Sequence, residues 1–305
     1  MTGVLAGFLV IGVVIGVGYL VGRRGVLGPH AQEVLSRASF LVATPALLFT
    51  TLAGAELGDV FSPVLLVTSV SALAAIAVFA VVGAVCGWGL GRTTIGALSA
   101  SMVNSANLGI PIAIYVLGDA TAVAPLLLFQ LVVLVPASLV VLDLAVPGSG
   151  TTLRERLLAP VKNPVLIGSA LGLLVSAFDV RVPGFLLDPI GLLGGLAVPA
   201  VLLAYGISLH GSPVPGRGAE RAPVLTAVGV KLVGMPLVAW LLGLALGLGP
   251  QTLFVVVVLC ALPAAQNIFT YAVTYRTAVD LARESITLST VGSIPVLLVV
   301  SALLG

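Results

Sequence analysis

The sequence has few charged residues and no long polar stretch. Only 8% of its 305 residues are charged, 59% are hydrophobic, and the mean hydropathy is +1.25. A soluble domain carries about 25% charged residues, so this composition excludes a soluble globular chain and predicts a polytopic membrane protein. The longest polar stretch, residues 147–163, is too short for a separate domain and is expected to be a linker.

Residues that bind metals or carry redox chemistry are also scarce. Cys86 and Cys260 lie within apolar runs, where they are typical of small packing residues, and His30 and His210 lie in polar loops without metal-ligand spacing. The sequence shows no nucleophile motif with partners, no phosphate-binding glycine loop and no basic run for nucleic acid. We therefore expect neither an enzyme nor a nucleic-acid partner, and no cofactor beyond a coupling Na⁺ or H⁺.

What the sequence does contain is a series of apolar runs, mostly of about 18–25 residues, separated by charges or turn residues. They predict an all-α membrane protein with ten transmembrane helices. The predicted spans are 3–22, 32–54, 62–90, 94–118, 122–146, 164–178, 186–210, 223–248, 251–275 and 280–304. The first lacks the basic leader of a signal peptide, so we expect it to remain as a span.

Basic residues are concentrated at alternate connections between these spans. Of the 13 Lys and Arg residues, all but Arg181 and Lys231 lie at odd-numbered connections. The even-numbered connections carry mainly acidic residues, namely Glu56, Asp59, Asp119, Asp179 and Asp188. The positive-inside rule then places the odd-numbered connections in the cytoplasm and both termini on the opposite side.

Two of the predicted spans are interrupted. The fourth, 94–118, contains Asn104, Asn107, Gly109 and Pro111 within eight positions. Proline removes a backbone donor and glycine loosens the helix beside it. In hydrocarbon, non-helical backbone is tolerated only where protein or a wet cavity surrounds it, so we predict a broken helix.

The ninth span is interrupted about 150 residues later, at Leu262-Pro263-Ala264-Ala265-Gln266-Asn267. Pro45 and Pro199, in the second and seventh spans, have a similar offset. Five spans per half is an odd number, so the second half would enter the membrane in the opposite direction. We therefore predict inverted repeats at residues 1–146 and 164–305, with a binding site where the two breaks meet.

The polar groups at the breaks are the candidate binding groups. A half-helix that begins in the turn of Pro111 would present N–H donors and a positive dipole end, which favour an anion. If the breaks cross, their amides suit a carboxylate or a partly dehydrated cation; the alternative is that they only bond the frayed backbone around each proline. The candidate residues are Asn104, Asn107, Gly109 and Pro111 at the first break and Pro263, Gln266, Asn267 and Thr270 at the second.

Lys231 is a further candidate for substrate binding. It lies about eight positions into the eighth span, roughly 12 Å deep, where a charge costs about 2.5–3.5 kcal/mol and usually faces an interior or a cavity. It could hold an anionic substrate, snorkel to the cytoplasmic surface, or pair structurally with Asp143 near the end of the fifth span. Hydroxyls in the tenth span, Ser289 among them, are expected to bond backbone groups or neighbouring helices.

Five stretches of the sequence carry a resemblance to a known family. They are Asn104-Ser-Ala-Asn-Leu-Gly109-Ile-Pro111, Pro160-Val-Lys-Asn163-Pro164, Ala197-Val-Pro199 with Tyr205-Gly206, Lys231 with Pro236, and Leu262-Pro263-Ala264-Ala265-Gln266-Asn267. Through them the chain resembles, over nearly its whole length, the auxin efflux carrier family within the bile acid/auxin carrier superfamily.

The resemblance implies crossed fourth and ninth helices, a scaffold and a transport domain each drawn from both repeats, an elevator-like mechanism and often a homodimer. The substrates of this family are typically organic anions, which are auxin in plants and dicarboxylates in bacteria. Plant members have a long loop between the halves and an Asn-Pro motif at the second break. The short linker and the Gln266-Asn267 pair indicate a bacterial member in the inner membrane.

We therefore expect a secondary transporter that carries small organic anions, such as mono- or dicarboxylates and auxin-like acids, across the plasma membrane. Two alternatives stay open. One is a sodium-coupled organic-anion symporter of the bile-acid type, and the other is a membrane sensor or scaffold that transports nothing.

Overall fold

The computed structural model describes residues 2–54, 62–145, 164–210 and 220–305. These residues form helices, joined by short connections and by an isolated antiparallel β-bridge between Val103 and Ala264. The predicted linker 147–163 lies outside the described residues.

Six helices within the described part are long and apolar enough to cross a membrane. They are Ala31–Ala53, Pro63–Val85, Ala120–Leu142, Gly184–Ser208, Arg221–Ala245 and Val279–Leu304. Shorter apolar helices cover Ser105–Leu117, Pro164–Ala177 and Pro250–Ala261. A chain with this many apolar helices is a multi-pass membrane protein. The count of ten crossings stays a prediction.

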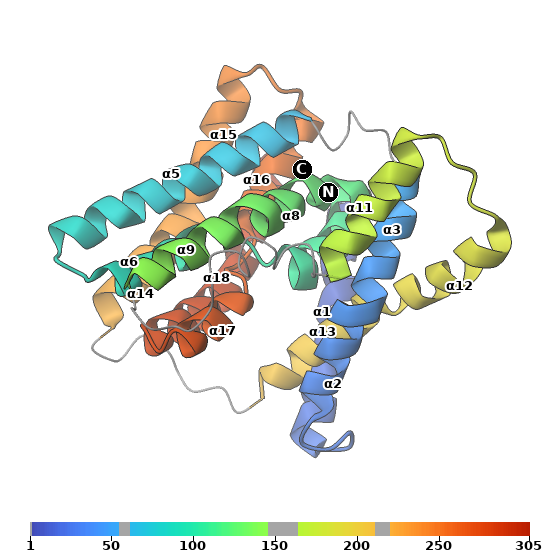
Figure 1. The fold of residues 1–305 in the computed structure, drawn as a ribbon, viewed down its shortest axis with the longest axis horizontal. Coiled ribbons are helices and arrows are strands. Elements are labelled where there is room, and N and C mark those ends of the chain that lie inside the picture. Colours follow the sequence, from blue (N-terminus) through green and yellow to red (C-terminus); the bar gives the residue numbers. More distant parts are fainter. Residues whose placement is uncertain (1, 55–61, 146–163, 211–219) are drawn as a thin grey trace. The chain divides into compact units, whose positions relative to one another are not determined.

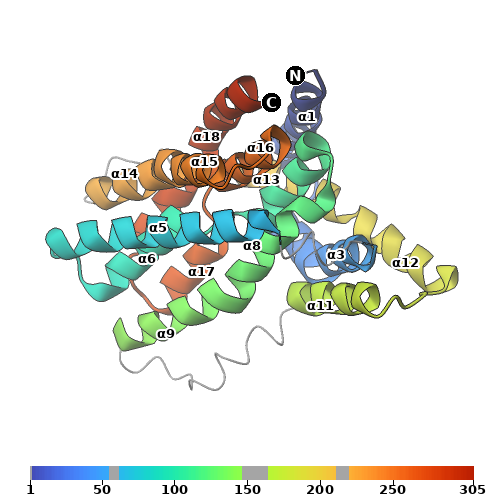
Figure 2. The same ribbon diagram turned by 90° about the horizontal axis from the view of Figure 1, so that it is seen from above.

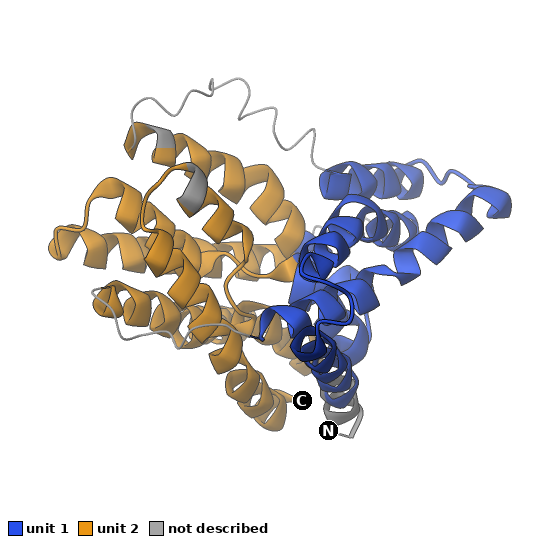
Figure 3. Cartoon of the chain, turned by 90° about the horizontal axis from the view of Figure 1, so that it is seen from below, with its two compact units in different colours: residues 1–62, 106–125, 160–213 blue, residues 63–105, 126–159, 214–305 orange. Residues whose placement is uncertain are grey.

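The chain divides into two compact units, and each takes segments from both halves of the sequence (Figure 3). Unit 1 comprises residues 1–62, 106–125 and 160–213, and unit 2 comprises residues 63–105, 126–159 and 214–305. Neither unit is therefore a contiguous half of the chain.

Unit 1 is built on helices that approach closely through glycine. It contains α1 (Thr2–Arg24), α2 (Ala31–Ala38), α3 (Thr44–Ala53), α7 (Ile110–Ile112), α11 (Pro164–Ala177), α12 (Gly184–Gly195) and α13 (Ala197–Ser208). In Figures 1 and 2, α11 runs beside α3, and α1 packs against α13.

Glycines lie at both of these helix contacts. A Cβ atom placed on Gly206 of α13 would lie 2.1 Å from the carbonyl oxygen of Ile15 in α1. A Cβ on Gly168 of α11 would lie 2.5 Å from the carbonyl oxygen of Pro45. Small residues let membrane helices pack backbone to backbone, so Gly168 and Gly206 serve helix packing in unit 1.

Unit 2 holds both breaks, with the first part of the fourth predicted span and the whole ninth predicted span. It contains α5 (Pro63–Val85), α6 (Leu90–Ser101), α9 (Val135–Ala145), α14 (Arg221–Gly229), α15 (Met235–Ala245), α16 (Pro250–Ala261), α17 (Asn267–Thr274) and α18 (Val279–Leu304). The helix α8 (Ala124–Phe129) spans the boundary between the units in the sequence. Within unit 2, α5 packs along α6 and also contacts α15 and α16 (Figures 1 and 2).

An ion pair joins the beginnings of two broken or bent spans in unit 2. The guanidinium of Arg92, in α6, donates to Oε2 of Glu220 at 2.7 Å from Nη2 and 3.0 Å from Nε, and it lies 5.9 Å from the centre of the Trp88 ring. Glu220 is the residue before α14. Arg92 lies at the third predicted connection and Glu220 at the seventh, so the ion pair agrees with the prediction that these connections share one side.

Replacing Gly206 by alanine should destabilise the protein, because the new methyl group collides with the backbone of α1. Overpacking of this kind costs about 1–3 kcal/mol, and we expect a lower unfolding temperature in detergent for Gly206→Ala. Gly191→Ala is the matched control, since a Cβ on Gly191, in α12 of the same unit, meets no atom within 4 Å. Equal unfolding temperatures for the two variants would contradict the role of Gly206 in packing.

Candidate solute-binding site

The first predicted break is present, but it lies before the position expected. The helix α6 ends at Ser101, Met102 is extended, and helical structure resumes at Ser105 with a π-helical turn, η2 (Ser105–Gly109), that leads into α7. Helical structure therefore resumes at Ser105, six residues before Pro111. Pro111 lies in the first turn of α7, where its missing donor costs little, so it does not need to break the chain there.

The second break lies where the sequence predicts it. The helix α16 ends at Ala261, Leu262 adopts extended backbone dihedrals, and α17 begins at Asn267. Residues 262–266 are outside any helix.

The two breaks meet in unit 2 and pair with each other. The backbone N–H of Asn104 donates to the carbonyl oxygen of Pro263 at 2.9 Å, and the N–H of Ala265 donates to the carbonyl oxygen of Met102 at 3.0 Å. These two bonds flank the antiparallel bridge between residues 103 and 264. Each break thus supplies partners for backbone groups that the other has freed from its helix, as hydrocarbon requires.

Side chains from two other helices hold the centre of each break. Gln130, in the π-helical turn η5 (Gln130–Leu134), accepts a hydrogen bond from the N–H of Val103 through Oε1 and donates to Oγ of Ser105 through Nε2. Ser289, in α18, accepts a bond from the N–H of Ala264 at 3.1 Å and donates to the carbonyl oxygen of Ile286. Both side chains are buried. The expected backbone-bonding role of Ser289 is confirmed.

Gln130 is the residue that sequence reasoning missed. It stands in the apolar fifth span without a proline or a second amide next to it. The available signal was the cost of burying an amide without a partner, which alone marks Gln130 as a residue that must bond to something in the interior.

The structure brings part of the predicted set together at this crossing. Asn104 and Pro263 share the backbone bond described above, and Gln266 and Asn267 follow in the same short segment. Asn104 is buried, Gln266 is half-buried, and Asn267 and Thr270 are exposed. Nδ2 of Asn267 lies 3.5 Å from the hydroxyl of Tyr271. The amides of the crossing therefore range from its interior to the surface of unit 2.

The other predicted residues of the first break fall into unit 1. Asn107, Gly109 and Pro111 lie on the helical segment Ser105–Leu117, whose residues from 106 onward belong to that unit. Asn107 is half-buried, whereas Gly109 and Pro111 are buried.

The helical segments that follow the two breaks both begin at the crossing, although the first belongs to unit 1 from residue 106 onward. One begins at Ser105 and the other at Asn267. The N-terminus of a helix carries about +0.5 elementary charge and N–H groups without intrahelical partners. The helices α6 and α16 end at the same place, at Ser101 and Ala261, so helix N-termini and helix C-termini both lie at the crossing.

Lys231 lies behind the crossing and is completely buried. Its side chain has no accessible surface, and Nζ donates to the carbonyl oxygen of Cys260 at 3.0 Å and lies 3.0 Å from Sδ of Met235. Snorkelling to the surface is therefore excluded. The side chain of Asp143, the other partner considered, lies outside the described residues.

The partner of Lys231 explains why a buried ammonium is tolerated. Cys260 is the second-last residue of α16, and its carbonyl is among the four at a helix C-terminus that lack an intrahelical donor. A cation at this end also offsets the negative pole of the helix dipole. Lys231 thus caps the half-helix that leads into the second break.

Comparison with known proteins identifies the family. The sequence matches the family model described as membrane transport protein over residues 4–156 and 150–301, which together cover nearly the whole chain. The chain belongs to the membrane transport protein family. This membership confirms the resemblance to the auxin efflux carriers.

A relative of this membrane transport protein occurs in an archaeon. It is an uncharacterized transporter of Methanothermobacter thermautotrophicus (strain Delta H), 26% identical over 280 residues that cover 91% of this chain and 90% of that protein. Since the alignment covers both breaks, the similarity extends to the part of the chain that forms the crossing.

Removing the Gln130 amide should destabilise the crossing of this membrane transport protein. In Gln130→Leu the buried N–H of Val103 loses its partner, which costs about 1–3 kcal/mol, so the unfolding temperature in detergent should fall. Gln251→Leu is the matched control, because Gln251 is exposed in the first turn of α16. An unfolding temperature for Gln130→Leu that equals that of the control would show that the bond to Val103 contributes nothing.

Proposed function

We propose that this protein is a secondary transporter of small organic anions, and that the carboxylate of the solute binds where the two breaks cross. Mono- and dicarboxylates and auxin-like acids are the solutes of this chemistry. The observation that carries the proposal is the reciprocal pairing of Met102 and Asn104 with Ala265 and Pro263, from which two half-helices begin. Membership of a transporter family supports the general function.

The anion preference follows from the groups around the crossing. Two helix N-termini begin there, and amides of Asn104, Gln266 and Asn267 supply donors of the kind that carboxylates accept. Lys231 adds a positive charge behind the site without reaching the solute, since its ammonium is engaged by Cys260. In this proposal Lys231 acts through the position of α16 and through its electric field.

We further propose that the architecture consists of ten helices in two inverted repeats, 1–146 and 164–305, joined by the linker 147–163. The hydrogen bonds of the crossing support this symmetry. The bond from Asn104 to Pro263 is the counterpart of the bond from Ala265 to Met102. Gln130, from the fifth predicted span, holds Val103 as Ser289, from the tenth, holds Ala264.

In the proposed elevator-like mechanism, unit 2 is the transport domain and unit 1 is the scaffold, which can also mediate a homodimer. Unit 2 carries the paired breaks with Gln130 and Ser289, so these groups would move with it, whereas the helical segment from residue 106 onward belongs to unit 1. The membrane is the bacterial inner membrane, with odd-numbered connections in the cytoplasm and both termini outside.

Uptake by purified protein in proteoliposomes tests the substrate class. We expect uptake of dicarboxylates or aryl acetates. For Asn104→Ala and Asn267→Ala we expect kcat/KM to fall at least about tenfold, because each variant loses one to two hydrogen bonds to a charged group. Gln251→Ala, at the far end of α16 from the break, is the control. Absence of binding and uptake for every organic anion tested would refute the anion proposal.

The unfolding temperature separates a binding role from a folding role. If Asn104→Ala and Asn267→Ala lose uptake and unfold at the temperature of the parent protein, the amides act on the solute. If uptake and unfolding temperature fall together, the amides serve only the frayed backbone.

Sodium coupling is a second candidate that one observation favours. Oxygen atoms of Ser105, Ser289 and the backbone of Val103 gather around the crossing, and hydroxyl and carbonyl oxygens are ligands that Na⁺ accepts. Replacing an inward Na⁺ gradient by an equal choline gradient should abolish concentrative uptake by a symporter. Uptake that is unchanged in choline, and that responds only to pH, would assign the coupling to protons.

A further inference from the structure

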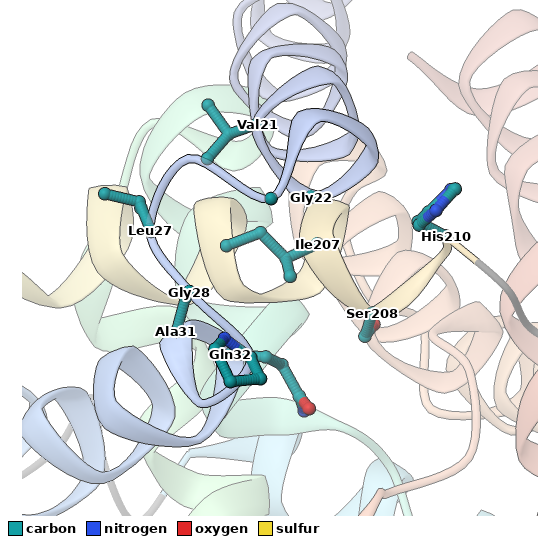
Figure 4. A pocket seen from close by; sticks show the side chains of 11 residues that line it. Val21, Gly22, Leu27, Gly28, Ala31, Gln32, Ile207, Ser208 and His210 are labelled. Atoms are coloured by element: carbon teal, nitrogen blue, oxygen red, sulfur yellow. The ribbon is translucent and has the colours of Figure 1, made fainter.

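A cavity in unit 1, distant in sequence from the breaks, has no role in the transporter proposed above. It has a volume of about 560 Å³ and lies between the turn after α1, the beginning of α2 and the end of α13 (Figure 4). Ligand pockets in proteins usually measure about 300–1,000 Å³, so the cavity has the size of a small-molecule site.

The walls of the cavity are partly polar. Gln32 contributes an amide, Ser208 a hydroxyl and His210 an imidazole, whereas Leu27 and Ile207 contribute apolar side chains (Figure 4). Such a wall suits a ligand that has both hydrogen-bonding and apolar parts.

The charge next to the cavity is positive. Arg23 and Arg24 end α1 and stand between Gly22 and Gly25, which both line the cavity. Both arginines are exposed. The carboxylate of Glu33, in the first turn of α2, is paired with Arg37 at 2.8 Å, and no ion pair involves Arg23 or Arg24 among the described residues.

The turn beside the cavity presents apolar side chains outward. Gly25 and Gly28 adopt positive φ angles of 64° and 81°, and the N–H of Gly28 bonds to the carbonyl oxygen of Gly25 at 3.0 Å. The turn exposes 71% of Val26 and 56% of Leu27. Exposed apolar residues next to two arginines, at the end of an apolar helix, are typical of contact with the boundary between lipid headgroups and acyl chains.

We propose that this cavity binds the headgroup of an anionic phospholipid on the cytoplasmic side of the membrane. Arg23 and Arg24 attract the phosphate, the polar wall formed by Gln32, Ser208 and His210 bonds the headgroup, and Val26 and Leu27 contact the acyl chains. A phospholipid is favoured over a free anion because only a lipid uses the exposed apolar pair. Basic residues at the end of a membrane helix bind anionic lipids for the same electrostatic reason.

Lipid binding to the purified full-length protein tests this proposal independently of any transport activity. Native mass spectrometry in detergent, with phosphatidylglycerol and phosphatidylcholine titrated separately, counts the lipids retained. We expect phosphatidylglycerol to be retained at a concentration at least about tenfold lower than phosphatidylcholine, because each basic residue near the surface favours the anionic lipid by about fivefold. Equal retention of the two lipids would overturn the proposal.

Variants locate the lipid. Arg23→Gln with Arg24→Gln should remove the preference for phosphatidylglycerol, whereas Arg276→Gln with Arg283→Gln, a pair at the ninth predicted connection, should retain it. Ala31→Leu keeps both charges and should weaken retention by filling the cavity, since Ala31 is a buried wall residue. Retention that is unchanged in both the charge variant and the filled variant would overturn the proposed location.

Two further measurements distinguish the ligand and control for folding. Glycerol 3-phosphate is a headgroup without acyl chains, and if it raises the unfolding temperature as much as phosphatidylglycerol does, the ligand is a free anion and the lipid proposal fails. Unfolding temperatures in phosphatidylcholine should be equal for the parent and the charge variant, so that a loss of phosphatidylglycerol reports the site and not the fold.

Discussion

The rest of unit 2 depends on one constraint, which is that backbone N–H and C=O groups inside a membrane must find partners within the protein. Two spans of this chain are interrupted in their middle, and each interruption leaves groups that no helix can satisfy. Each break satisfies groups of the other, since the N–H of Asn104 donates to the carbonyl oxygen of Pro263 and the N–H of Ala265 donates to that of Met102. A single break inside hydrocarbon would need water or another segment beside it.

Side chains around the crossing bond further backbone groups that the helices leave without a partner. Gln130 and Ser289 accept hydrogen bonds from the N–H groups of Val103 and Ala264, the two residues of the β-bridge. Lys231 donates to the carbonyl oxygen of Cys260 at the end of α16. Each of these polar side chains is buried and has a backbone partner. The polar interior of unit 2 is therefore explained first by the needs of its own backbone, and the proposed solute uses the helix ends and amides that this arrangement presents.

Much of this could be predicted from the sequence because it depends on strong local signals. Apolar runs predicted the helices, and the paired Pro and Asn residues predicted both breaks and the contact between them. The exact start of the half-helix after the first break was missed, because Pro111 is equally compatible with a helix start and with the first turn after a π-helical segment. Gln130 was missed because its role comes from the tertiary contact with Val103, 27 residues away; an amide in an apolar span indicates only that some partner is needed.

The pairing of Val103 with Ala264 also has a consequence for how the chain is assembled in the membrane. Synthesis proceeds from the N-terminus, so the strand around Val103 is inserted about 160 residues before its partner exists. Gln130, which accepts the N–H of Val103 in the folded protein, follows only 27 residues later in the chain. Until α16 and α17 are synthesised, the carbonyl of Met102 and the N–H of Asn104 lack the partners that they have in the folded protein, so the first break depends on the second half of the chain.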